Sequence, residues 1–276
     1  MKNSIRHLNL SKHTFLVERT IFSNTFPELK ENRLRIYLLL CRVVGVNNKG
    51  LCFMSIKTIC NEVNLSEHYV KICIDWLARN YFIEKVKSPN RSNAYRVLIS
   101  PDYHKATKQY FSNGHMLRNR YDMKNDLNGY CEIPVDVMKG SILRNQTDWT
   151  DRKIKALGQL YLFHWIAEYG GVDPKVVEYR NTRPVINELM YHTIGCSKHE
   201  LSKCFIWLLR KGLLIKVKTV YRKNKFSCMN ELQYIGDLSV SNALPTDEII
   251  EVLRLTIIPD MKLNDALVKT GGKIQS

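Results

Sequence analysis

Two stretches of the chain are rich in lysine and arginine. Arg79–Arg96 contains five Lys/Arg residues against the single acid Glu84, and Arg210–Lys225 contains seven with no Asp or Glu. Each stretch follows a segment that carries Ser, His and Lys. Cationic side chains bind phosphate oxygens, and Ser, His and Lys side chains can form hydrogen bonds with base edges. These residue types favour the noncovalent binding of a polyanion.

The composition of the whole chain agrees with an anionic partner. The 276 residues include 42 Lys/Arg and 26 Asp/Glu, which gives a net charge of +16, and 45% of them are hydrophobic, enough for a packed core. Nucleic acid is the first candidate partner and an anionic membrane surface is the second. The N-terminal segment lacks the apolar core of a signal peptide, and no stretch approaches 18 uninterrupted apolar residues. We therefore expect a cytoplasmic protein.

Motifs for catalysis, cofactors and metals are absent from the sequence. There is no G-x-x-x-x-G-K-[ST] or H-E-x-x-H pattern, and Gly271-Gly272-Lys273 lacks the strand that precedes a phosphate loop. Cys196, His199 and Cys204 have some of the spacing of a zinc site, but Cys204 falls on a predicted core stripe and metal ligands normally come in pairs. We expect no enzyme activity, no cofactor and no metal, and mostly buried thiols among the eight cysteines.

An internal repeat organises the sequence. Residues 66–87 (SEHYVKICIDWLARNYFIEKVK) align without a gap to residues 197–218 (SKHELSKCFIWLLRKGLLIKVK), at an offset of 131 and with nine identities in 22 positions. The identities include Ser66 with Ser197, Cys73 with Cys204, and Trp76 with Trp207. A match that runs through a helix, a turn and a strand indicates a duplicated module rather than one shared helix pattern.

Each copy has the same predicted order of elements. The first has helices over 33–44, 55–63 and 66–80, a turn at Asn64-Leu65, and strands over 83–88 and 94–99. The second has helices over 151–168, 183–194 and 197–211, strands over 214–221 and 226–235, and a turn at 222–225 between them. Short strands that lead into helical turns are expected in 13–22 and 129–138. The predicted domains are 13–100 and 128–236, joined by a basic linker over 101–127, with a C-terminal helix and a flexible tail over 237–276.

This order of elements resembles the winged helix-turn-helix family. The segment 197–218 has that family's Ser cap, an apolar residue four positions on, a Leu pair, and a Gly-Leu-Ile-like step at Gly212 into the hairpin; the first copy has Tyr81 in place of this glycine. The resemblance covers both copies. It implies an α+β fold of two winged helix-turn-helix domains in tandem, mainly helical with short β-hairpin wings, in which the second helix of each pair enters the major groove.

The same resemblance identifies the candidate DNA-binding residues, which lie on the second helix of each pair and on the basic hairpin after it. In the first copy they are Ser66, His68, Tyr69, Lys71, Ile72, Arg79, Lys85, Lys87 and Arg91. In the second copy they are Ser197, Lys198, His199, Ser202, Lys203, Arg210, Lys216, Lys218, Arg222, Lys223 and Lys225. The alternatives are solvated charged strands for the hairpins and a capping or surface role for His68 and His199. For Trp76 and Trp207 we favour packing over base stacking.

These observations predict sequence-specific binding of double-stranded DNA without catalysis. The tandem arrangement resembles plasmid and phage replication initiators and replisome organisers, which implies a C-terminal contact (245–258) with host replication proteins or with a second copy. A transcriptional regulator of the same architecture is the alternative. Two hypotheses come from other classes, a protein-interaction scaffold and an enzyme built around 101–150. A DNA-binding protein should bind a duplex with an affinity that falls steeply as salt rises, and neither of these two hypotheses expects this.

Overall fold

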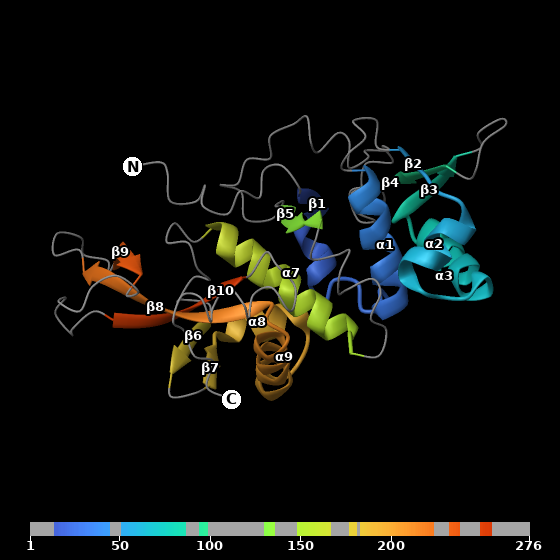
Figure 1. Ribbon diagram of the computed structural model, residues 1–276. Helices are drawn as coiled ribbons and strands as arrows, with labels where there is room; N and C mark the ends of the chain where they lie inside the picture. Colours follow the sequence, from blue (N-terminus) through green and yellow to red (C-terminus); the bar gives the residue numbers. More distant parts are fainter. Residues whose placement is uncertain are drawn as a thin grey trace. The chain divides into compact units, whose positions relative to one another are not determined.

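The computed structural model describes residues 14–44, 51–86, 94–98, 130–135, 148–166, 177–180, 183–223, 232–237 and 249–255. Over these residues the fold is α+β, with helices and small antiparallel sheets (Figure 1). The chain divides into two compact units. The first unit spans Leu10–Gln159, and the second unit spans Leu160–Ser276 together with Met1–Asn9.

The first unit is built from a central helix, a helix pair and a three-stranded sheet. In chain order its elements are β1 (Thr14–Glu18), η3 (Arg19–Phe22), α1 (Glu31–Val44), β2 (Leu51–Phe53), α2 (Ile56–Val63), α3 (Glu67–Arg79), β3 (Ile83–Val86), β4 (Ala94–Val97), β5 (Tyr130–Pro134) and the start of α7 (Asp151–Ile166). The sheet has the order β2-β4-β3 and is antiparallel throughout. The predicted helices and the β3–β4 hairpin are therefore confirmed, and β2 is a strand that was not predicted from the sequence.

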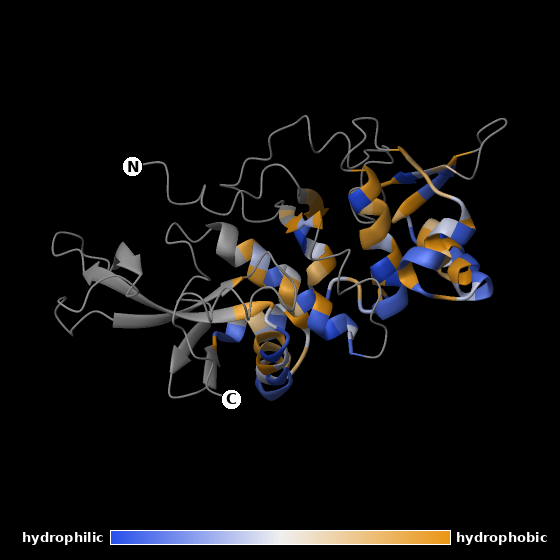
Figure 2. Ribbon diagram, in the orientation of Figure 1, coloured by the Kyte–Doolittle hydropathy of each residue, from blue (hydrophilic) through white to orange (hydrophobic). Residues whose placement is uncertain are grey.

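Helix α1 forms the core of the first unit because its apolar residues surround the helix rather than lining one face. All seven residues from Leu34 to Leu40 are buried, and the middle of α1 is orange in Figure 2. Helix α3 and strands β1, β2 and β4 all contact it. The buried Tyr37 hydroxyl donates a hydrogen bond to the Leu98 carbonyl at 3.2 Å, which ties the helix to the end of β4. Burial also raises the pKa of Tyr37, so this hydroxyl stays a donor.

The two short strands expected at the start of each copy are confirmed, and they pair with each other. β1 and β5 are antiparallel, with Phe15 opposite Ile133 and Val17 opposite Cys131. These four side chains are buried. The segment that opens the second copy in the sequence therefore contributes a strand to the first unit.

Glycine at position 158 allows helix α7 to approach Phe22 closely. A Cβ atom at Gly158 would lie 2.2 Å from Cδ1 of the Phe22 ring, which is 1% exposed. The neighbouring Gln159 side-chain amide donates to the Phe22 carbonyl at 3.0 Å, and the Cys131 thiol donates to the Gly158 carbonyl at 3.2 Å. The absence of a side chain at 158 thus lets η3, β5 and α7 pack together.

The second unit contains the rest of α7, a second helix pair and two sheets. Its elements after α7 are β6 (Val177–Arg180), β7 (Arg183–Ile186), α8 (Glu188–Ile194), α9 (Lys198–Arg210), β8 (Leu214–Lys223), β9 (Leu232–Asp237) and β10 (Ile249–Leu255). β6 pairs with β7, and the larger sheet has the order β10-β8-β9. Helix α9 contacts both β7 and β8. The predicted antiparallel pairing of the two strands that follow α9 is confirmed.

The helix predicted over 183–194 is wrong in its first part. Residues 183–186 form strand β7, and the helix begins at Glu188. Pro184 disfavours the helical conformation at the residue before it, and the following Val185 and Ile186 are β-branched. The strand pairs with β6 from Val177↔Ile186 to Arg180↔Arg183. The turn predicted at 222–225 also begins too early, since Arg222 and Lys223 are still paired with β9.

The helix predicted in the C-terminal segment 245–258 is wrong. Residues 249–255 form β10, which pairs with β8 along its whole length, from Ile249↔Val220 to Leu255↔Leu214. The segment Ile-Ile-Glu-Val-Leu-Arg-Leu has three β-branched residues, and the free edge of β8 offers it seven paired positions. Pairing between distant segments therefore overrides a local helical pattern.

The predicted linker over 101–127 and the tail after 255 lie outside the described residues, and the domain limits drawn from the sequence stay predictions. The limit between the two compact units falls within α7, at Gln159 and Leu160. Among the described residues, no helix has the length and apolar character needed to cross a membrane.

We expect Gly158→Ala to destabilise the first unit by about 1–3 kcal/mol, because the new methyl group would collide with a buried ring. Alanine is the better helix former by about 1 kcal/mol, so a gain in stability would show that Phe22 is free to move. Denaturant unfolding followed by circular dichroism measures the difference. Phe22→Leu in the Gly158→Ala background provides the control, because a smaller side chain at 22 should restore part of the stability.

Candidate nucleic-acid interface

The two helix pairs, α2–α3 and α8–α9, are joined by turns of the same geometry. Asn64 ends α2 in the left-handed region with φ 52°, and Gly195, at an offset of 131, follows α8 with φ 72°. The next amide in each copy closes the same hydrogen bond, from Leu65 to Cys60 at 3.3 Å and from Cys196 to Tyr191 at 3.1 Å. Glycine and asparagine are the residues that adopt this conformation most readily.

Serine caps the second helix of each pair. The Ser66 hydroxyl accepts from the Tyr69 amide at 3.4 Å, and the Ser197 hydroxyl accepts from the Glu200 amide at 3.3 Å. Glu200 also accepts from the Ser197 amide at 2.9 Å, which completes a capping box in the second copy. Ser66 and Ser197, both predicted as DNA-binding residues, are exposed but already act as helix caps.

The step from the second helix to the hairpin is also repeated. Tyr81 and Gly212 occupy equivalent positions, and both have positive φ angles, 61° and 68°. The following amides donate to equivalent carbonyls, Phe82 to Leu77 at 2.9 Å and Leu213 to Leu208 at 3.0 Å. Tyrosine at 81 therefore adopts the backbone conformation for which glycine is suited, although the residue type alone left the geometry of this turn open. The same geometry occurs in both copies although the residue types differ.

One face of each second helix is buried and the opposite face is exposed. On α3 the buried residues are Val70, Cys73, Ile74 and Leu77, and on α9 they are Leu201, Cys204, Phe205 and Leu208, which are the same four positions of the repeat. The candidate residues His68, Tyr69, Lys71, Ile72 and Arg79 are exposed on α3. Of those on α9, Lys198, His199, Lys203 and Arg210 are exposed, and Ser202 is half-buried.

The basic residues of the first copy lie beside acids. Lys71 Nζ is 2.7 Å from Glu67 Oε1, which lowers the pKa of Glu67 and raises that of Lys71. Lys85 on β3 forms an ion pair with Asp75 on α3 and lowers the pKa of that carboxyl. Between Ser66 and Val86 there are three Lys/Arg and three Asp/Glu, so this stretch of the chain has no net charge.

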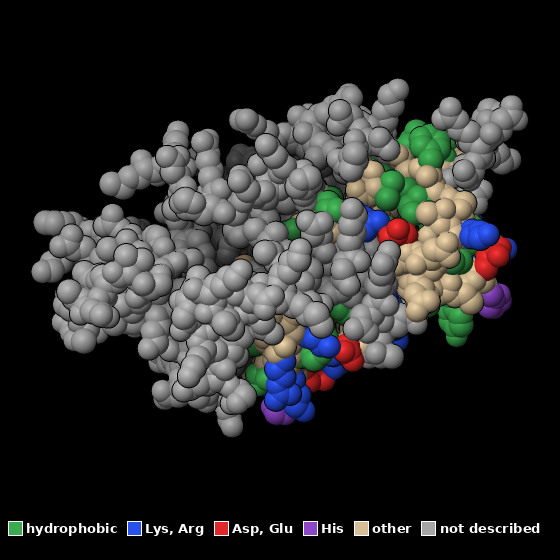
Figure 3. Space-filling view, in the orientation of Figure 1, with side chains coloured by type: hydrophobic (Ala, Val, Ile, Leu, Met, Phe, Trp, Pro, Cys, Tyr) green, Lys and Arg blue, Asp and Glu red, His purple; other side chains and the backbone are tan. Residues whose placement is uncertain are grey.

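The second copy lacks these acids. The positions of Glu67, Asp75 and Glu84 are occupied by Lys198, Ile206 and Ile215. Between Ser197 and Val217 there are five Lys/Arg and one Glu, a net charge of +4. Lys198, Lys203 and Arg210 form no ion pair within the part of the chain that the structure describes. In Figure 3 blue side chains and a purple histidine are visible where α9 lies, with red and green side chains beside them.

The hairpin candidates of the second copy lie mostly on one strand. Lys216, Lys218, Arg222 and Lys223 belong to β8, where Arg222 pairs with Gln233 and Lys223 with Leu232. Lys87, Arg91 and Lys225 lie outside the described residues. On β4, Arg96 forms an ion pair with Glu84 of β3.

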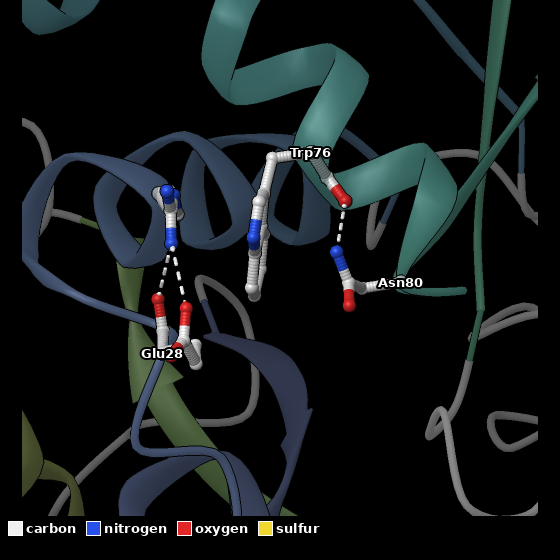
Figure 4. Close-up of polar contacts among 4 residues, drawn as sticks. Glu28, Trp76 and Asn80 are labelled. Carbon is white, nitrogen blue, oxygen red and sulfur yellow. Dashed lines mark hydrogen bonds and ion pairs between the residues drawn. The ribbon is translucent and has the colours of Figure 1, made fainter.

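Trp76 packs within the protein, as the sequence indicates. Its ring stacks on Phe82 with centroids 5.5 Å apart, and the Arg33 guanidinium lies 4.2 Å from the ring centroid. Arg33 is held in turn by the Glu28 carbonyl at 2.8 Å, and the Asn80 amide donates to the Trp76 carbonyl at 2.9 Å (Figure 4). This set of contacts fixes the C-terminal end of α3, from which the β3–β4 hairpin begins.

Two basic residues near the candidates were not selected from the sequence. Lys57 is exposed in the first turn of α2, and Lys211 caps α9 with its Nζ 5.8 Å from the Trp207 ring centroid. Lys211 belongs to the Arg210–Lys225 basic stretch, so the charge pattern contained the signal. Lys57 stands alone in the sequence, and only the exposed start of α2 makes it a candidate.

The cysteines and histidines do not form a metal site among the described residues. Cys204 is buried on the packed face of α9 whereas His199 is exposed on the opposite face. Cys41, Cys52, Cys73, Cys131 and Cys204 are buried, and burial raises the pKa of Cys52 to about 12. Thiols of this kind are unreactive packing residues.

Comparison with known proteins adds no relative. No protein-family model matches the chain, and no curated protein matches it.

Positions 81 and 212 share a left-handed backbone conformation, but we expect substitution by alanine to affect them differently. Gly212→Ala should destabilise the protein by about 1–2 kcal/mol, because a Cβ atom is disfavoured at φ 68°. Tyr81→Ala is the matched control, since the wild-type residue already carries a Cβ atom in this conformation and its side chain is exposed. Denaturant unfolding of both variants checks this. Equal destabilisation at the two sites would contradict the assignment of strain to the backbone.

Proposed function

We propose that the protein binds double-stranded DNA in a sequence-specific manner through two winged helix-turn-helix modules. In this proposal α3 and α9 are the recognition helices that enter the major groove, and the hairpins β3–β4 and β8–β9 are the wings. The order of helix, strand, two helices and hairpin in the first unit supports this assignment. So does the agreement of turns, caps and hydrogen bonds between the two copies at a constant offset.

The observation that carries the proposal is the set of exposed cations on α9. Lys198, Lys203 and Arg210 project from the face opposite the buried stripe, and their stretch of the chain has a net charge of +4. A solvated helix needs no such excess of one sign, because unbalanced cations repel one another unless an anion neutralises them. A duplex provides that anion as closely spaced phosphates, and a helix fits its major groove.

The narrower role that we propose is that of a plasmid or phage replication initiator. Two modules in one chain suit the recognition of repeated or adjacent half-sites on one duplex. Sequencing of genomic fragments that the purified chain retains tests this role. Sites clustered at a replication origin support it, and sites at promoters support a transcriptional regulator instead.

The first test of DNA binding compares charge removal on the two helices. In fluorescence anisotropy with a labelled duplex, Lys198→Ala with Lys203→Ala should weaken binding and lower the slope of log K against log salt by about 1.8, or roughly 0.9 for each phosphate that is no longer neutralised. The matched control is Glu67→Ala with Lys71→Ala, which removes an ion pair from the equivalent turn of α3 without changing the net charge. Its slope should fall by less than that of the α9 variant, because Glu67 already neutralises Lys71.

Two results would contradict the proposal. If the wild-type chain does not bind the duplex even at low salt, the DNA-binding proposal is wrong and a protein scaffold becomes the better hypothesis. If both double variants change the slope equally, the charge difference between the two copies has no part in binding.

The second test addresses the second wing. Substitution of Lys216, Lys218, Arg222 and Lys223 by alanine should weaken binding to all duplexes by a similar factor and lower the salt slope, because phosphate contacts carry affinity rather than sequence choice. The preference for a selected duplex over a scrambled one should stay unchanged. An unaltered affinity would show that β8 does not contact phosphates.

A further inference from the structure

The exposed face of α3 differs from that of α9 in two apolar side chains. Tyr69 is 57% exposed and Ile72 is 46% exposed, and they lie three residues apart, so they are neighbours on the helix surface. The equivalent positions on α9 are Glu200 and Lys203, which are charged. No buried stripe requires apolar residues here, since the packed face of α3 is supplied by Val70, Cys73, Ile74 and Leu77.

The two side chains project from the part of the helix that approaches base edges. Tyr69 and Ile72 are the third and sixth residues of α3, and the polar residues Ser66, His68 and Lys71 are exposed around them. In the major groove, the apolar group that a base pair presents is the C5 methyl group of thymine. A pair of exposed apolar side chains within a polar rim has the right chemistry and size for one or two such methyl groups.

A protein partner fits this face less well. Stable protein interfaces bury about 800 Å² on each side around an apolar centre of several residues. Here only two apolar side chains lie together, the exposed His68 lies beside them, and Lys71 and Glu67 form an exposed ion pair on the same helix. The patch is too narrow for such a centre.

We propose that the first module recognises thymine, through contact of Ile72 and Tyr69 with C5 methyl groups in the major groove, while the α9 module supplies most of the attraction to phosphates. This inference rests on the proposed DNA-binding function. It assigns different tasks to the two copies: the copy whose stretch 66–86 has no net charge selects bases, and the copy whose stretch 197–217 has a net charge of +4 binds the backbone.

The experiment uses the full chain and two forms of one duplex. The duplex is selected from a random-sequence pool by the wild-type chain, and it is then synthesised with thymidine or with deoxyuridine, which lacks only the methyl group. The wild type should bind the thymidine form about fourfold more tightly for each methyl group contacted, as expected for burial of one methyl-sized group. Ile72→Ala with Tyr69→Ala should reduce this ratio towards one.

A control variant separates base reading from overall affinity. Lys203→Ala, at the position equivalent to Ile72, should weaken binding to both duplexes and leave the thymidine-to-deoxyuridine ratio unchanged. Circular dichroism melting confirms that each variant folds, and the exposure of both side chains makes a failure to fold unexpected.

The outcomes distinguish this inference from the function on which it rests. If wild-type binding depends steeply on salt but the thymidine-to-deoxyuridine ratio is one, recognition of thymine is overturned and DNA binding is supported. The exposed face of α3 is then the surface to test for binding of a protein. A ratio that persists in the Ile72→Ala, Tyr69→Ala variant assigns methyl recognition to another element and overturns the inference. An absence of binding to any duplex at low salt overturns both proposals.

Discussion

The burial of four side chains on α3 and of the four equivalent side chains on α9 decides which residues of these helices face the solvent. Val70, Cys73, Ile74 and Leu77 fix the rotation of α3, and Leu201, Cys204, Phe205 and Leu208 fix that of α9. Each fully buried aliphatic or aromatic side chain contributes about 1.5–3 kcal/mol. Rotation of either helix would expose part of this stripe, so the burial of the stripe determines which side chains are exposed. Left-handed residues on both sides of each helix add a second constraint, because they set the direction in which the chain enters and leaves it.

The parts of the fold that sequence reasoning predicted are those governed by local rules. The Ser66 and Ser197 caps, the buried stripes and the turn at Asn64 follow from residue types within one turn of helix, and the repeat made each prediction twice. The missed parts depend on distant partners. Ile249–Leu255 has a helical pattern but pairs with β8, and Arg183–Ile186 pairs with β6. β2 and β7 lie at nearly equivalent positions before their helix pairs, but neither strand was predicted from the sequence.

The charge difference between the copies is already present in the sequence, because the three acids of the first copy have no acidic counterparts in the second. The basic stretches 79–96 and 210–225 indicate that both copies are rich in Lys and Arg. The acids of the first copy, Glu67, Asp75 and Glu84, are spread over 18 positions of the chain. The fold brings Asp75 against Lys85, ten residues apart in the chain, and Glu84 against Arg96 across a strand pair. The contacts add which acids lie beside Lys71, Lys85 and Arg96 of the first copy.

Such a division has a physical advantage for a protein that must find one site among many. Cations increase affinity for every duplex alike, so two faces with a charge of +4 would strengthen nonspecific binding as much as specific binding. A face without net charge adds little to nonspecific affinity, and its contribution arises only where base edges match its side chains. Under the proposed function, one copy attracts the backbone of any duplex, while the other increases the ratio between affinity for the correct site and affinity for all others.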